Sequence, residues 1–289
     1  MRRKLIGILL HKDDTGFIFY KYLIKLLIKE WRALGFATQI IRGTDRLVPA
    51  DIVISHVDLT VVPDEYKEFL AQYPCAYNRS VPDISKSRIS TNLVGRDDPY
   101  AGPVIVKTDR NSGGFAEVRM VGRGHLFRAL GRRLAIRNKV NTEVAWDAVR
   151  QLRSGEYPVF SSLQNVPPEI FSNQHLVIEK FLPEIIDDHY HISYYHFLGD
   201  MDLVERYQSK DKVVKASTSI GFEMVPVPPE VREFRKKLGM DYGKIDYVIN
   251  DGKLIILDVN PTPVVPAKDA LTKGIARHLA AGITSPLSR

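Results

Sequence analysis

The sequence predicts an α/β protein whose first lobe is a three-layer α/β unit and whose last lobe contains a β-hairpin. Over residues 1–82, short apolar runs alternate with amphipathic stretches in the order strand, helix, strand, strand, helix. This order is typical of a mainly parallel sheet covered by helices. The expected strands are 4–10, 36–41 and 51–57, and the expected helices are 15–35 and 64–73. Near the end of the chain, two apolar runs flank Asp251–Gly252, a strong hairpin turn signal.

Two further lobes are expected, a central one over residues 83–180 and a C-terminal one over residues 181–289, because periodic segments there alternate with turn residues. The expected strands are 103–107, 116–121, 175–182, 190–200 and 201–208, and the expected helices are 141–155 and 230–240.

The composition favours partners that carry negative charge. The 289-residue chain has a formal net charge of +7, and a basic surface attracts nucleotides, phosphorylated substrates, nucleic acid or acidic lipid. The densest basic run, residues 123–139, resembles a helix and is interpreted as a solvated basic face or a phosphate-facing loop rather than a nucleic-acid patch, since basic and aromatic residues do not interleave in the chain.

Compartment signals point to a cytoplasmic protein with no membrane partner. The only cysteine, Cys75, excludes an intrachain disulfide and fits a reducing compartment. The N-terminal apolar run, Leu5–Leu10, is too short for a signal-peptide core or a membrane span.

Acidic residues interrupt the apolar strands of the C-terminal hairpin. Strict alternation places Asp258 and Asn260 on one face of the second strand and Leu257 on the other. Pairing across the tight turn brings Asp246 close to both. Carboxylate and amide oxygens suit Mg²⁺ that is held through nucleotide phosphates. The alternative is a pair of strand-end acids neutralised by Lys244.

A lysine and two adjacent glycines follow an apolar strand in the central lobe. Lys107 ends the strand, and Gly113 and Gly114 stand in the expected turn of a β-hairpin. A lysine there can reach phosphate oxygens, and glycines let backbone N–H groups approach them. Neither GxxxxGK[ST] nor GxGxxG occurs in the chain.

The connector "EKFL" could frame a nucleobase with backbone groups and apolar side chains. Asp187 or Asp188, a few residues later, could then hold the ribose hydroxyls. The connector residues are Glu179, Lys180, Phe181 and Leu182.

The lysine with its Gly-Gly turn, the connector and "KIDYVINDGKLIILDVNPTP" together resemble the ATP-grasp superfamily. The hairpin is similar to that of D-alanine–D-alanine ligases and glutamate-adding ribosomal-protein ligases. The resemblance covers about residues 84–268 and implies an ATP-grasp fold with an N-terminal α/β pre-grasp lobe. It implies that Asp246, Asp258 and Asn260 hold Mg²⁺, which Mn²⁺ could replace, and that Lys107 contacts the phosphates of ATP.

The same resemblance implies roles for further lysines. Lys86 resembles the earlier phosphate lysine of the family. Lys215 stands for the late lysine near the γ-phosphate, and Lys210 and Lys212 compete for that role.

The hairpin departs from the family pattern at two positions. Asp258 stands where Glu is usual, and Lys244 stands where Arg is common. Lys keeps the charge of Arg but lacks its planar fork, so Arg206 on the neighbouring strand is expected to supply that fork.

The implied activity is that of an ATP-dependent carboxylate–amine or carboxylate–thiol ligase acting through an acyl-phosphate on small-molecule acids and amines. A homodimer is common in the resembled family. The alternatives are an ATP-binding module with reduced catalysis and a small-molecule kinase of the same fold. In the first lobe, His56 and Asp58 end a buried strand and are either substrate-cleft residues or loop caps.

Overall fold

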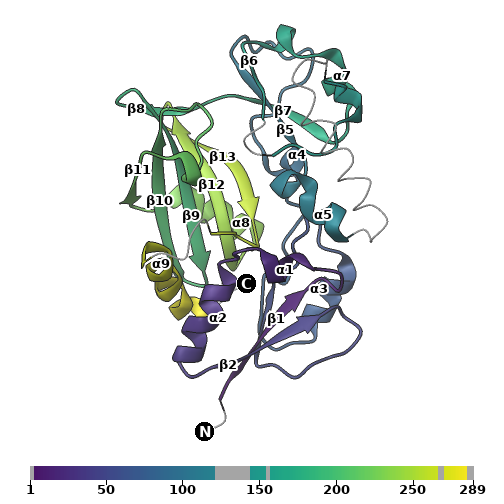
Figure 1. Ribbon diagram of the computed structural model, residues 1–289, viewed down its shortest axis with the longest axis vertical. Helices are drawn as coiled ribbons and strands as arrows, with labels where there is room; N and C mark the ends of the chain where they lie inside the picture. Colours follow the sequence, from purple (N-terminus) through teal and green to yellow (C-terminus); the bar gives the residue numbers. More distant parts are fainter. Residues whose placement is uncertain (1–2, 121–143, 154–156, 266–269, 285–289) are drawn as a thin grey trace.

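Three β-sheets organise the described part of the molecule, which is elongated (Figure 1). The structure is a computed structural model that describes residues 3–120, 144–153, 157–265 and 270–284. The basic run 123–139 lies outside these residues. The first sheet is parallel and the other two are antiparallel. The predicted α/β class is therefore confirmed.

The N-terminal sheet has the strand order β2-β1-β3-β4, and every pair in it is parallel. Its strands are β1 (Leu5–Leu10), β2 (Ala37–Arg42), β3 (Ile52–Ser55) and β4 (Ala76–Tyr77), and its main helices are α2 (Ile24–Ala33) and α3 (Asp64–Ala71). Helix α2 buries Ile24, Leu27 and Trp31 at helical spacing against the sheet core.

The single helix predicted over 15–35 is wrong, because the chain forms α1 (Gly16–Phe19) and then α2. The backbone between them pairs instead with the segment after β13: Leu23 N donates to Pro263 O over 2.8 Å, and Val265 N donates to Lys21 O over 2.8 Å. These long-range hydrogen bonds replace those that a continuous helix would make.

The central sheet has the order β6-β5-β7 and is antiparallel. Its strands are β5 (Val104–Thr108), β6 (Val159–Phe160) and β7 (Leu176–Lys180). Around it lie α4 (Lys86–Ile89), η1 (Asn111–Gly114), α5 (Phe115–Met120), η2 (Trp146–Ala148), η3 (Leu163–Asn165) and α7 (Pro168–Ser172).

Two predictions for the central lobe are wrong. Residues 115–120 form a helix rather than a strand, since Ala116 and Met120 bury one helical turn apart and good helix formers surround them. The described part of the expected helix 141–155 is a short 3₁₀ turn followed by chain without regular secondary structure. Asn173 holds this turn by donating to the carbonyls of Trp146 and Val149.

The C-terminal sheet has the order β11-β10-β9-β12-β13, and β8 pairs with β9. Its strands are β8 (Glu184–Ile186), β9 (His189–Leu198), β10 (Met201–Ser209), β11 (Gly221–Val225), β12 (Tyr242–Asn250) and β13 (Lys253–Asn260). The helical segments are η4 (Ala216–Thr218), α8 (Pro229–Leu238), α9 (Ala270–Ala280) and η5 (Ala281–Thr284).

The closing hairpin forms as predicted, but with a bulge. Asp251 and Gly252 both have positive φ and connect β12 to β13. Asp246 pairs with Asp258, and then Tyr247 pairs with Ile256, so Leu257 is an extra residue in the ladder. Strict alternation is therefore wrong here, because Leu257 lines the same cavity as Asp258.

The N-terminal and C-terminal sheets share one hydrophobic core, which fixes their relative position. Helices α2 and α9 lie side by side (Figure 1), and Trp31 Nε1 donates to Ala280 O over 3.1 Å. The buried Asn78 side chain accepts from the backbone N–H groups of Asp241 and Tyr242. The chain just after β4 is thereby held next to the start of β12.

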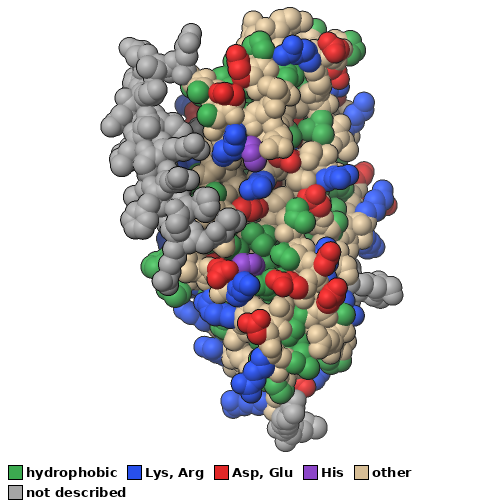
Figure 2. Space-filling view, turned by 90° about the vertical axis from the view of Figure 1, so that its right-hand side faces the viewer, with side chains coloured by type: hydrophobic (Ala, Val, Ile, Leu, Met, Phe, Trp, Pro, Cys, Tyr) green, Lys and Arg blue, Asp and Glu red, His purple; other side chains and the backbone are tan. Residues whose placement is uncertain are grey.

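The surface carries charges of both signs. On the face shown in Figure 2, Lys and Arg side chains occur together with Asp and Glu side chains along the molecule. Within the described ranges, no helix combines the length and apolarity needed to cross a membrane.

Candidate active site

A cavity of about 640 Å³ lies between the central sheet and the C-terminal sheet. Both sheets and the loop after β10 contribute to its wall. The predicted site residues that line it are Lys86, Lys107, Glu179, Lys180, Phe181, Leu182, Lys215, Lys244, Asp246, Asp258 and Asn260. The topology thus brings residues from five separate stretches of sequence into one space.

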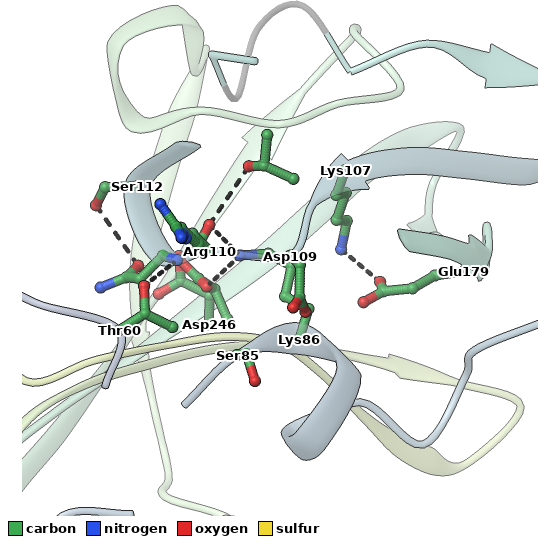
Figure 3. A network of polar contacts seen from close by, with 12 residues as sticks. Thr60, Ser85, Lys86, Lys107, Asp109, Arg110, Ser112, Glu179 and Asp246 are labelled. Carbon is green, nitrogen blue, oxygen red and sulfur yellow. Dashed lines mark hydrogen bonds and ion pairs between the residues drawn. The ribbon is translucent and has the colours of Figure 1, made fainter. Parts of the chain in front are cut away.

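Lys107 and Glu179 form the ion pair of the central sheet. They lie on neighbouring antiparallel strands, and Lys107 Nζ is 2.6 Å from Glu179 Oε2 (Figure 3). Both side chains are buried, and the second oxygen of Glu179 has no hydrogen-bond partner in the described part of the chain. An unsatisfied buried carboxylate oxygen is costly, so this pair is well placed to exchange contacts with a polar ligand.

Two more lysine–carboxylate pairs lie at the hairpin. Lys86, at the start of α4, places Nζ 3.0 Å from Asp258 Oδ1. Lys244 Nζ lies 2.7 Å and 3.0 Å from the two oxygens of Asp246. Burial alone would lower the pKa of each lysine, but the neighbouring aspartates raise both above their ordinary value. Both lysines therefore stay charged at neutral pH.

The two aspartates form a cross-strand pair on the cavity side of the hairpin. Burial raises the pKa of Asp246; the charge of Lys244 opposes this, and the charge of Asp258 adds to it. Asn260 Oδ1 lies on the same strand end and accepts from Thr262 N over 2.8 Å. Two adjacent carboxylates with an amide oxygen fit a hard cation that also binds phosphate oxygens.

The connector residues 179–182 lie at the end of β7 and just after it, and they line the cavity. Lys180 N donates to Asn92 O and Phe181 N donates to Pro103 O, each over 2.8 Å. These two N–H groups are used inside the fold, so they cannot pair with a nucleobase. The Lys180 ammonium lies 5.1 Å from the ring centroid of Tyr100.

The prediction for Arg206 is wrong in its geometry. Glu205 and Tyr207 line the cavity, and strand alternation turns Arg206 to the opposite face of β10. There its guanidinium pairs with Glu223 at 2.7 Å and Glu184 at 3.5 Å. It does not supply a fork beside Lys244.

Asp187 and Asp188 are also not brought to the cavity. Both have positive φ and form the exposed two-residue turn between β8 and β9. Such turns favour Asp because it tolerates the left-handed region. Their sequence signal therefore reflects hairpin geometry.

The glycine pair has a packing role instead of forming a hairpin tip. Gly113 and Gly114 are buried with positive φ, and a Cβ on Gly113 would lie 2.3 Å from Leu152 O. The neighbouring Ser112 lines the cavity, and the two glycines do not. Among the competing lysines, Lys212 and Lys215 line the cavity, whereas Lys210 is exposed outside it.

A polar chain on the cavity wall was not predicted from the sequence. His196 Nε2 lies 3.0 Å from Glu205 Oε2, and Tyr207 donates to Glu205 Oε1 over 2.9 Å. All three side chains are buried and line the cavity. The signal was the alternation of "HISYYHF" with "LVERYQ", which places these residues on one face once the hairpin register is known.

The two first-lobe candidates differ in position. Asp58 lines a second, adjacent cavity, whereas His56 is fully buried among the rings of Phe17, Tyr22 and Tyr242. Burial lowers the pKa of His56 to about 4. Asp58 thus lies at a cavity wall and His56 does not.

Solved structures similar to this chain were found at low sequence identity. A RimK domain ATP-grasp protein from Sphaerobacter thermophilus is 11% identical, with a TM-score of 0.49, covering 98% of this chain and all of that one. The macrocyclase MdnC bound with precursor peptide MdnA, from Microcystis aeruginosa, is 12% identical (TM-score 0.46, covering 95% and 99%). D-alanine–D-alanine ligase from Bacillus anthracis is 13% identical (TM-score 0.45, covering 97% and 96%). No protein-family model and no curated protein matches the chain.

Proposed function

We propose that the chain binds Mg·ATP in the larger cavity and uses it to join a carboxylic acid to an amine. The observation that carries this proposal is the convergence of two buried lysines, the half-buried Lys244 and two cross-strand aspartates on one space. Lysines neutralise phosphate oxygens, and the aspartates with Asn260 suit Mg²⁺. The connector residues Phe181 and Leu182 lie on the same wall, and their apolar side chains would frame the nucleobase.

In this reaction a substrate carboxylate oxygen attacks the γ-phosphorus, the bond to the bridging oxygen breaks, and ADP leaves. The amine nitrogen then attacks the acyl carbon, phosphate leaves with the bonding electrons, and the nitrogen loses a proton. A thiol could replace the amine in the second step. Bound Mg²⁺ would neutralise charge on the phosphate oxygens.

The residues of the chain would position the reactants and stabilise charge. Lys107 and Lys86 are held by acidic partners in directions that face the cavity. Lys244 lies beside the hairpin acids and 4.0 Å from the ring centroid of Tyr194, so its position is fixed from two sides. Preorganised charge of this kind stabilises a phosphoryl-transfer transition state without rearrangement.

A second candidate is a module that binds ATP without ligation. It is favoured by Lys244, a point charge where a planar guanidinium would hold an acyl-phosphate in two hydrogen bonds. A kinase that stops at the phosphorylated acid is the third candidate.

ADP release measured against a panel of acids, with and without a panel of amines, separates these candidates. The ligase predicts ADP release that needs an acid and yields product only with an amine or thiol. Amine-independent accumulation of a phosphorylated product would identify a kinase. Mg·ATP binding with no ADP release on any combination would support the binding module and contradict the ligase.

A further inference from the structure

A second cavity of about 310 Å³ adjoins the larger one, at the junction of the N-terminal lobe and α5. Ser112, Phe115, Arg153 and Val264 line both cavities, so a bound molecule could extend from one into the other. The second cavity is lined further by Tyr20, Tyr22, Asp58, Ala116, Arg119 and Thr262. Its wall therefore combines aromatic rings with arginines.

Asp58 holds other side chains of this wall in place through hydrogen bonds and is not itself free to bind a ligand. Its Oδ2 accepts from Tyr22 Oη and from Arg119 Nη2, each over 2.8 Å. Its Oδ1 accepts from Thr262 Oγ1 over 2.7 Å. Both carboxylate oxygens are thus engaged, and the contacts fix the directions of the Tyr22 and Arg119 side chains.

The Arg119 guanidinium is packed between the Tyr20 ring and Gly16. Its guanidinium carbon lies 4.6 Å from the ring centroid of Tyr20, and a Cβ on Gly16 would lie 2.9 Å from the same group. Its buried Nε has no hydrogen-bond partner in the part of the chain that the structure describes. Asp58 takes only part of the planar donor fork, which leaves donors that match a second carboxylate.

The charge of the wall favours an anion. Arg119 and Arg153 are cationic, and Asp58 is the single acidic residue among the lining residues that the structure describes. A cavity with a cationic excess and low-dielectric aromatic walls attracts anionic ligands. Tyr20 and Phe115 offer apolar contact to the body of such a ligand.

We propose that this second cavity binds the carboxylate of a small, amino-acid-like substrate, with Arg119 as the residue that selects for it. The proposal rests on the proposed ligase function, because the substrate would reach the phosphate site through the shared wall. Arg119 recognises the carboxylate, and Asp58, Thr262 and Gly16 position Arg119.

The test is saturation-transfer NMR on the full chain with N-acetyl derivatives of alanine, leucine and phenylalanine, each compared with its C-terminal amide. We expect signal from at least one acid and at least fivefold less from its amide. Arg119→Leu should abolish the acid signal. Gly16→Ala, which keeps every charge but pushes the guanidinium aside, should weaken it at least threefold. Arg119→Lys should retain part of it, and the exposed Arg277→Leu should leave it unchanged.

Equal signals from acids and amides, no signal from any acid, or an unchanged signal in Arg119→Leu and Gly16→Ala would overturn the proposal. If Arg119→Leu fails to fold, the acid signal of Gly16→Ala alone tests the proposal. Calorimetric titration of Mg·ATP into the same variants separates the two claims, and we expect affinities within twofold of the wild type. Acid binding without any Mg·ATP binding would contradict the proposed function and leave the carboxylate subsite standing.

Discussion

The ammonium group of Lys86 lies 3.0 Å from Oδ1 of Asp258, which joins the central lobe to the closing hairpin. Lys86 is 2% exposed, whereas the Asp258 side chain is 27% exposed toward the cavity. The lysine is therefore fixed by the fold and the acid is open to a ligand. A phosphate entering here would meet both a cation and the carboxylate that we propose as a Mg²⁺ ligand.

Replacing Lys86 by methionine should weaken ATP binding at least tenfold, because Met keeps the length and apolar stem but removes the charge that faces the phosphates. Calorimetric titration of Mg·ATP measures this effect. Lys67→Met is the matched control, since Lys67 pairs with Asp64 on the exposed side of α3. An unchanged Mg·ATP affinity in Lys86→Met would show that Lys86 has a structural role and does not contact ATP.

Arg206→Met should leave Mg·ATP affinity within twofold of the wild type, because the side chain lies on the sheet face opposite the cavity. The free energy of unfolding should fall by about 1 kcal/mol through the lost pairs with Glu184 and Glu223. Urea denaturation and calorimetry measure the two effects. A tenfold loss of ATP affinity with an intact fold would contradict this placement and support the sequence-based prediction that Arg206 acts in the site.

His56 should make the fold sensitive to acid. Burial lowers its pKa from 6.5 to about 4, against the smaller opposing effect of Asp58. The unfolded chain therefore takes up a proton first as pH falls, and stability is lost between about pH 6.5 and 4, by up to about 1.4 kcal/mol per pH unit.

His56→Phe should remove much of this loss, since the ring nitrogens have no hydrogen-bond partner among the described residues and three aromatic rings surround them. Urea unfolding at pH 7 and pH 5 gives the comparison, with the exposed His278→Gln as control. The same pH dependence in His56→Phe and the wild type would rule out His56 as its source.

The sequence was sufficient for the hairpin and for its acid pair, because the tight turn and the two-residue period act locally. The bulge at Leu257 could not be predicted, since it depends on Ile256 and Tyr247 packing into the core beneath the sheet. The break in the helix over 15–35 likewise depends on hydrogen bonds to Pro263 and Val265, more than 200 residues away.

Residue type alone led to a wrong prediction of a ribose site at the turn between β8 and β9. Asp187 and Asp188 are the residues that a ribose site and a two-residue hairpin turn both prefer, and the turn explains them here. Conversely, the contact of Asp58 with Thr262 spans 204 residues. No local pattern encodes it, and it forms because two sheets share one core.

The measurement that tests the central claim most directly is a calorimetric titration of ATP, with Mg²⁺ and then with EDTA, into the wild type, Asp258→Asn and the hairpin-turn control Asp188→Asn. The account predicts micromolar binding that needs Mg²⁺, falls at least tenfold in Asp258→Asn and is unchanged in Asp188→Asn. Binding of equal strength in Asp258→Asn and the wild type, or no ATP binding by the folded wild type, would contradict the assignment of this cavity to Mg·ATP.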